Sequence, residues 1–103
     1  MCLIECEGKT LSEILAKLYA TIQDRQANPR EGSYTTQLFN AGLDEIVKKV
    51  GEEAVEVVLA AARQGTERTV SELADLAYHA LVLMAQLGIT PDQVAAELER
   101  RHR

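Results

Sequence analysis

Apolar residues recur at helical spacing along most of the chain and alternate almost nowhere. From Thr10 onward they share one helical face, and the pattern ends before Asn28 and Pro29, so it predicts an amphipathic helix. Residues 29–32 have the composition of a turn. The next segment, residues 33–41, predicts a short helix that ends at Gly42.

Two longer helices follow in the pattern. Residues 43–63 carry their apolar side chains on one stripe, and a second long helix is predicted from about residue 69 to residue 87, ended by Gly88. Around residues 55–62 and 76–85, apolar side chains point in almost every direction, which is typical of a helix buried on all sides. Two thinner amphipathic helices cannot cover both long ones. We therefore expect a two-fold homodimer.

The last predicted helix has a clear start. Thr90 can act as its N-cap, Pro91 suits the first turn, and Gln93 completes a capping box. The helix runs to the basic end at residues 99–103, where cationic side chains favour the helix dipole. We interpret this tail as a solvated helix end rather than a nucleic-acid site.

The fold class predicted from these segments is all-α. Only residues 2–6 alternate even weakly with period two, and short connections favour antiparallel neighbours. We expect a bundle of four to five helices that dimerisation completes. Residues 10–103 would form the one domain, after an N-terminal segment, residues 1–9, of uncertain order.

Composition and charge restrict the possible partners. The 103 residues are 47% hydrophobic and 26% charged, a globular balance, and the formal net charge of −5 disfavours nucleic acid and anionic membranes. No apolar run approaches the length of a membrane span, and the N-terminus does not resemble a signal peptide, so a cytoplasmic location is expected. Cys2 and Cys6 have no further cysteines or clustered histidines with which to form a zinc site, and are interpreted as incidental thiols.

Acidic side chains interrupt the apolar runs of both long helices and share one face of each. On the first helix this face spans about 100° and consists of Lys49, Glu52, Glu53 and Glu56. On the second it spans about 60° and consists of Glu72, Asp75 and His79. Buried carboxylates without compensation are unstable, and protonation, basic neighbours or a bound dication can each relieve them. Oxygen-only ligands favour Mg²⁺, Mn²⁺ or Ca²⁺ over Zn²⁺, so two converging acidic pairs predict a divalent-cation site.

Each of these features also has a simpler interpretation. A Glu-Glu-x-x-Glu pattern is common on solvated helices, and Glu72 can complete a capping box that Thr69 begins. His79 is either a hydrogen-bonded core residue or a residue that supports the metal ligands. Gly51 weakens its helix by about 1 kcal/mol relative to Ala. Three explanations stay open for this glycine: another helix packs closely against it, the substrate approaches the backbone there, or the helix simply tolerates the loss of stability.

The chain resembles the all-α nucleotide pyrophosphohydrolases, which are MazG-like, and among them the phosphoribosyl-ATP pyrophosphatase family. The resemblance covers residues 10–102 and rests on Lys-Val-Gly-Glu-Glu-Ala from Lys49, on Asp-Leu-x-Tyr-His from Asp75, and on Ser-Tyr-Thr from Ser33. It implies hydrolysis of phosphoribosyl-ATP to phosphoribosyl-AMP and pyrophosphate in histidine biosynthesis, in a stand-alone enzyme that is dimeric.

The resemblance also implies roles for individual residues. The metal ligands, for Mg²⁺ with Mn²⁺ as a substitute, would be Glu53, Glu56, Glu72 and Asp75. Glu52 would be the catalytic acid residue, either orienting the attacking water or binding a further Mg²⁺. Candidates for substrate binding are Arg25, Arg30, Ser33, Tyr34, Thr35, Lys48 and Lys49, although each basic residue can equally be a solvated charge and the Ser-Tyr-Thr phrase can simply begin a helix.

Two other functions fit the same sequence. One is a house-cleaning or dUTP-type nucleoside triphosphate pyrophosphohydrolase of the same superfamily. The other is a non-catalytic helical dimerisation module whose acids are solvated.

Overall fold

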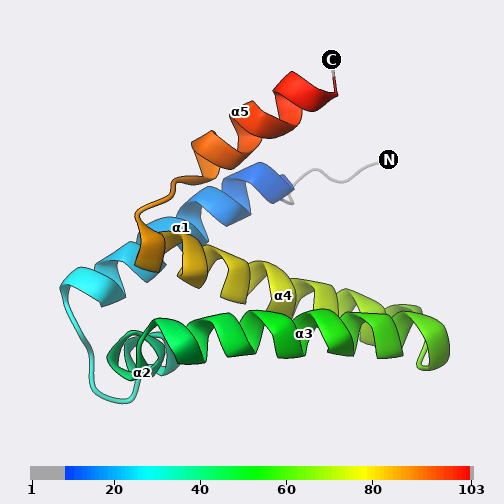
Figure 1. Ribbon diagram of the computed structural model, residues 1–103, viewed down its shortest axis with the longest axis horizontal. Coiled ribbons are helices and arrows are strands. Elements are labelled where there is room, and N and C mark those ends of the chain that lie inside the picture. The colour runs from blue at the N-terminus through cyan, green and yellow to red at the C-terminus, as the bar shows by residue number, and fades with distance from the viewer. Residues whose placement is uncertain (1–8, 103) are drawn as a thin grey trace.

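The computed structural model describes residues 9–102, and within that range the chain is entirely helical, with no strand (Figure 1). The helices are α1 (Leu11–Ala27), α2 (Tyr34–Ala41), α3 (Leu43–Arg63), α4 (Thr66–Leu87) and α5 (Pro91–Arg101). The predicted all-α class is confirmed. Three features predicted from the sequence lie outside the described residues: the thiols of Cys2 and Cys6, the weak alternation at residues 2–6, and the end of the basic tail at Arg103.

The helix ends follow the local sequence. The capping box predicted at Thr90 and Gln93 is present, and an equivalent box joins Thr10 to Glu13 at the start of α1. Helix α5 ends at Arg101, with His102 as its C-cap, close to the predicted basic end.

The start of α4 differs from the prediction. The helix begins at Thr66, because Gly65 adopts φ 94°, a backbone conformation that a residue with a Cβ rarely takes, and so turns the chain directly after α3. Thr69 is therefore inside α4, where its hydroxyl donates to the carbonyl of Gly65. The simpler interpretation of Glu72, as the end of a capping box that Thr69 begins, is therefore wrong.

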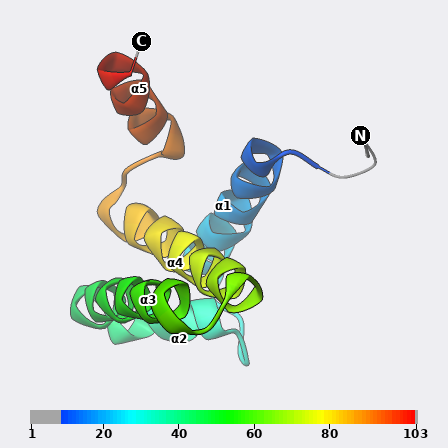
Figure 2. The same ribbon diagram turned by 90° about the vertical axis from the view of Figure 1, so that its right-hand side faces the viewer.

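Helices α3 and α4 form an antiparallel hairpin, since only two residues connect them, and they lie side by side in Figures 1 and 2. Helix α1 packs across α4, and α2 fills the corner between α1 and the start of α3. The buried core lies at this end of the hairpin and consists of Tyr19, Ile22, Leu38, Ile46, Leu81, Val82 and Ala85.

The other end of the hairpin is left uncovered by α1 and α2. Its large apolar side chains are exposed, among them Val58 at 64% and Val70 at 60%. Val55, Leu59 and Leu73 are exposed in the same region. The apolar excess expected around residues 55–62 is thus exposed on the distal half of α3, beside Val70 and Leu73 of α4. The excess expected around residues 76–85 lies in or against the core instead, where Leu81 and Val82 are buried.

Helix α5 buries none of its residues and diverges from α1 (Figure 2). Among the described residues, no single helix has the length and apolar character needed to cross a membrane. The pair α4 and α5 passes that test only together, and the two are bent by 109° at their connection.

Candidate metal centre between two core helices

The acidic faces of α3 and α4 border one cavity of about 750 Å³, here called the acidic cavity. Its carboxylates are Glu52, Glu53, Glu56, Glu72 and Asp75. Its cationic side chains are Lys48, Lys49 and Arg68. Five acids against three cations leave a formal excess of two negative charges. The predicted metal ligands and the predicted catalytic Glu52 are therefore brought together, in an environment that attracts cations.

Three of these acids converge most closely and are called the acid triad: Glu53 of α3 with Glu72 and Asp75 of α4. One oxygen from each lies within 4.8 Å of the others. Glu72 is only 4% exposed, and Oε1 of Glu53 is buried without a hydrogen-bond partner among the described residues. A buried, unpartnered carboxylate oxygen beside two more carboxylates is unfavourable in the protein alone. An all-oxygen donor set of this kind fits a hard divalent cation.

Glu56 lines the same cavity, one turn beyond Glu53, but it does not belong to the group of oxygens that converge within 4.8 Å. Gly51 also lines the cavity. A Cβ at Gly51 would meet no atom within 4 Å, so no close helix contact within this chain requires glycine there.

Arg68 is a residue of the candidate site that the sequence analysis missed. Its guanidinium lies 2.8 Å from the buried carboxylate of Glu72, while its own side chain is 56% exposed. The pair spans one helical turn, from position i to position i+4, and this spacing was the available signal. Arg68 therefore supplies Glu72 with a counter-ion at the position where a bound metal would act.

Lys49 and Lys48 differ in their surroundings, although both line the cavity. Lys49 lies 3.4 Å from Glu52, whereas Lys48 lies 3.9 Å from Glu45, outside the acidic cavity lining. Desolvation acts to lower the pKa of Lys49, but the hydrogen bond to Glu52 and the neighbouring acidic groups together raise it above its ordinary value. Lys49 is thus a firmly charged group beside the predicted catalytic acid.

His79 lies outside the acidic cavity and links α4 to the start of α2 instead. It is buried, and its Nδ1 donates to the carbonyl oxygen of Asp75 at 2.8 Å, because that oxygen can only accept. In the neutral ring Nε2 then accepts from the hydroxyl of Tyr34 at 3.2 Å. His79 therefore connects Tyr34 to the backbone of Asp75, a member of the acid triad. This arrangement agrees with the interpretation of His79 as a hydrogen-bonded core residue.

A second contact fixes α2 beside α4. The hydroxyls of Thr35 and Tyr78 are hydrogen bonded, and the rings of Tyr34 and Tyr78 stack with centroids 6.2 Å apart. Burial raises the pKa of the Tyr78 phenol, so this hydroxyl stays protonated over the neutral range. The Ser-Tyr-Thr phrase is thereby held against α4.

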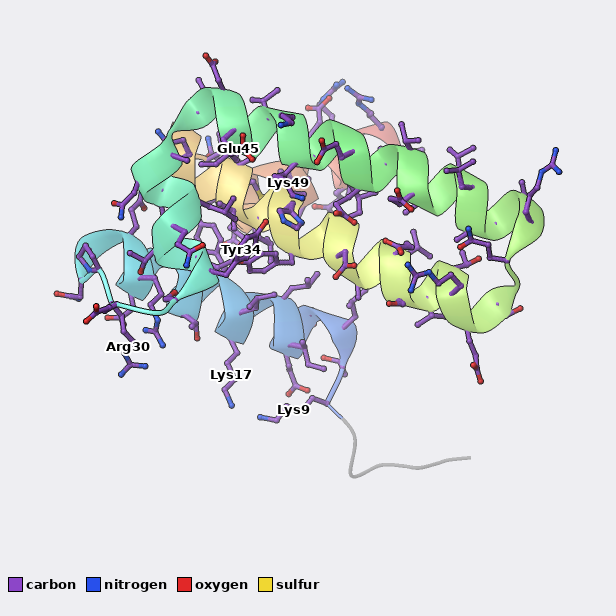
Figure 3. All side chains as sticks on the ribbon, turned by 90° about the horizontal axis from the view of Figure 1, so that it is seen from below. Lys9, Lys17, Arg30, Tyr34, Glu45 and Lys49 are labelled. Carbon is purple, nitrogen blue, oxygen red and sulfur yellow. The ribbon has the colours of Figure 1, made fainter. Side chains whose placement is uncertain are left out.

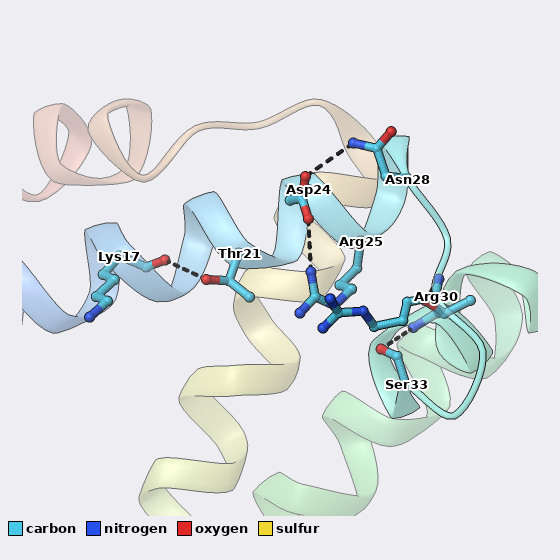
Figure 4. A network of polar contacts seen from close by, with 8 residues as sticks. Lys17, Thr21, Asp24, Arg25, Asn28, Arg30 and Ser33 are labelled. Atoms are coloured by element: carbon cyan, nitrogen blue, oxygen red, sulfur yellow. Dashed lines mark hydrogen bonds and ion pairs between the residues drawn. The ribbon is translucent and has the colours of Figure 1, made fainter.

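The predicted substrate-binding residues fall into two groups. Lys48 and Lys49 line the acidic cavity. The others, except Tyr34, line a separate cavity of about 430 Å³, here called the loop cavity, between α1 and the loop before α2 (Figure 4). Its lining includes Thr21, Arg25, Arg30, Glu31, Ser33 and Thr35. Tyr34 lies in the sequence between Ser33 and Thr35 of the loop cavity, and its phenol is among the groups that act on Lys49 of the acidic cavity (Figure 3).

The fold and the acid triad define an all-α protein with a candidate divalent-cation site between two antiparallel core helices. Residues 15–102 match the phosphoribosyl-ATP pyrophosphohydrolase family, and the chain belongs to that family. The resemblance found in the sequence is confirmed.

Individual relatives agree with the family assignment. The chain is 56% identical over 84 residues to a phosphoribosyl-ATP pyrophosphatase of Lacticaseibacillus casei, covering 82% of this chain and 76% of that one. It is 51% identical over 90 residues to one of Sulfurisphaera tokodaii, covering 87% and 96%. It is also 48% identical over 92 residues to the histidine biosynthesis bifunctional protein HisIE of Oceanobacillus iheyensis, covering 89% and 43%. The chain thus spans less than half the length of that bifunctional relative.

Proposed function

We propose that this chain hydrolyses phosphoribosyl-ATP to phosphoribosyl-AMP and pyrophosphate, as a step of histidine biosynthesis, with Mg²⁺ as its cofactor and Mn²⁺ as a substitute. The observation that carries the proposal is the acid triad with the unpartnered Oε1 of Glu53, in a member of this family. The names of the relatives support the substrate and the biosynthetic role.

Each acid of the cavity has a distinct part in this proposal. Glu53, Glu72 and Asp75 would hold the ion, with Glu56 as a further ligand from the next turn of α3. When bound, Mg²⁺ neutralises polyphosphate oxygens and makes the attacked phosphorus more electrophilic. Glu52 is exposed, with only Lys49 paired to it among the described residues, and would accept the proton of the attacking water.

The basic side chains of the acidic cavity would orient the polyphosphate. Lys49 carries its charge beside Glu52, and the preceding residue, Lys48, lines the same cavity. Both would offer point charges to phosphate oxygens during the reaction. His79 would hold Asp75 indirectly, through the backbone carbonyl that accepts its Nδ1 proton.

The substrate assignment is tested by comparing turnover of phosphoribosyl-ATP with that of ATP and dUTP under the same Mg²⁺ concentration. We expect kcat/KM for phosphoribosyl-ATP to exceed both by about a hundredfold or more, since a site that holds an additional charged group discriminates strongly against substrates that lack it. Equal or higher kcat/KM for an ordinary nucleoside triphosphate would favour the house-cleaning or dUTP-type alternative. No hydrolysis of any of them would favour the non-catalytic module.

We also propose that the chain is a homodimer. The exposed apolar side chains of the distal α3–α4 hairpin, Val55, Val58, Leu59, Val70 and Leu73, form the surface that a second copy would cover. The absence of nucleic-acid and membrane partners and the cytoplasmic location stay predictions from the sequence, as does the division into residues 1–9 and 10–103.

The dimer proposal predicts that Val58→Glu yields monomers, because a charge placed in an apolar interface loses its hydration without gaining a partner. Sedimentation equilibrium measures the mass directly. Leu11→Glu is the matched control, since Leu11 is 72% exposed at the start of α1, away from the distal hairpin. The proposal is contradicted if the wild-type chain is monomeric, or if both variants remain dimers.

A further inference from the structure

The loop cavity is also lined by charged side chains, and its two arginines and one glutamate give it the opposite sign to the acidic cavity. Arg25 of α1 and Arg30 of the loop both line it, and Figure 4 shows both side chains at the end of α1 and the loop that follows. Arg25 is paired with the neighbouring Asp24 at 2.8 Å. Arg30 has no ion-pair partner among residues 9–102, and the nearby Glu31 is exposed. At least one guanidinium is therefore available to an anion.

Hydroxyl groups complete the lining. The hydroxyl oxygen of Ser33 accepts from the backbone N–H of Thr36, which leaves its own proton to donate. The backbone N–H of Arg30 donates to Thr36 at 3.0 Å, so the position of Arg30 on the loop is fixed. Two guanidinium groups beside a hydroxyl donor form a set suited to a phosphate monoester, and neither arginine needs a metal ion to bind one.

The loop cavity is also connected to the acid triad. Ser33 and Thr35 line it, and Tyr34 between them is hydrogen bonded to His79, whose other nitrogen donates to the carbonyl of Asp75. Tyr34, whose side chain is exposed, thus links the lining of the loop cavity to the backbone of the acid triad. The substrate of the proposed function has two phosphate-bearing ends, a triphosphate and a ribosyl phosphate. The two cavities offer one metal-dependent and one metal-independent site for such groups.

We infer that the loop cavity binds the ribosyl 5′-phosphate of the substrate through Arg25, Arg30 and Ser33, while the acidic cavity holds the triphosphate. The inference rests on the proposed function and adds to it the physical basis of substrate choice. ATP lacks the ribosyl phosphate, so it would use the acidic cavity alone.

The test compares the binding of two ligands to the full chain in the presence of Mg²⁺: the product phosphoribosyl-AMP and AMP, which lacks the ribosyl phosphate. The affinities of wild type and Arg30→Gln for both ligands are measured by isothermal titration calorimetry. We expect wild type to bind phosphoribosyl-AMP about tenfold or more tightly than AMP, and Arg30→Gln to remove most of that difference while leaving AMP affinity unchanged. Folding is not at risk, because Arg30 is exposed and its backbone hydrogen bond is retained. Arg63→Gln, at an exposed arginine outside the loop cavity lining, is the matched control and leaves both affinities unchanged.

Three results would overturn the inference. One is equal affinity of wild type for the two ligands, another is an unchanged difference in Arg30→Gln, and the third is an equal loss of affinity for both ligands in that variant. Turnover of phosphoribosyl-ATP by the wild-type chain is measured separately. A chain that hydrolyses it but shows any of these three results keeps the proposed function and loses only this assignment.

Discussion

Glu53→Gln is expected to make the metal-free protein more stable and the enzyme almost inactive. The substitution removes one of three carboxylates whose oxygens lie within 4.8 Å, and with it the repulsion at the unpartnered Oε1. A gain on the order of 1 kcal/mol corresponds to a melting temperature about 4–8 °C higher. The same change removes a metal ligand, so the several kcal/mol of metal-assisted catalysis are lost and turnover falls about a hundredfold or more.

Differential scanning calorimetry with and without Mg²⁺ separates these two effects. The wild-type chain should gain about 2.7 kcal/mol at a free Mg²⁺ concentration 100 times its Kd, whereas Glu53→Gln should gain little. Glu99→Gln, an exposed glutamate of α5, serves as the control and should keep both the Mg²⁺ response and the activity. If Glu53→Gln destabilises the metal-free protein and leaves the Mg²⁺ response intact, Glu53 is not a ligand.

Arg68→Gln is expected to have the opposite effect to Glu53→Gln: it should destabilise the metal-free protein and strengthen Mg²⁺ binding. Without Mg²⁺, the variant leaves the buried carboxylate of Glu72 without its counter-ion, which costs about 1–2 kcal/mol after allowance for the solvent that screens the half-exposed guanidinium. With Mg²⁺ bound, the ion neutralises Glu72 instead, so the difference from wild type shrinks. By the same thermodynamic cycle, the Kd for Mg²⁺ falls about tenfold.

Lys48→Gln is the matched control for Arg68. Lys48 is another cation that lines the acidic cavity, but its partner is Glu45, outside the acid triad. We expect its metal-free stability and its Mg²⁺ affinity, measured by calorimetric titration, to stay near wild type. An Arg68→Gln variant that loses the same stability with and without Mg²⁺ would show that Arg68 does not compete with the ion.

Much of the fold could be predicted because each helix carries its own local signals. The capping box at Thr90 and the glycine after α4 are properties of a few adjacent residues, so the sequence is sufficient to place them. The start of α4 was misplaced because Thr69 with Glu72 satisfies the capping pattern. Gly65, at φ 94°, is the N-cap instead, four residues before Thr69, and α4 begins at Thr66.

The candidate site was predictable only as far as helical spacing determines it. Positions three and four apart share a helix face, which explains why the acids of α3 and α4 border one cavity. The spacing does not show that Glu53, Glu72 and Asp75 converge while Glu56 stays outside their group, since this depends on the rotation of one helix against the other. It also does not show that Arg25 and Arg30 share a cavity, because a loop of irregular backbone brings them together.

The central claim is that the acid triad holds a divalent cation. Anomalous X-ray diffraction from crystals of the wild-type chain grown with Mn²⁺, the proposed substitute for Mg²⁺, tests it most directly. We expect an anomalous peak in contact with carboxylate oxygens of Glu53, Glu72 and Asp75, with the Arg68 guanidinium displaced from Glu72. The claim would be contradicted if Mn²⁺ gave anomalous peaks at other sites in the crystal but none at the acid triad, and if Arg68 were still paired with Glu72.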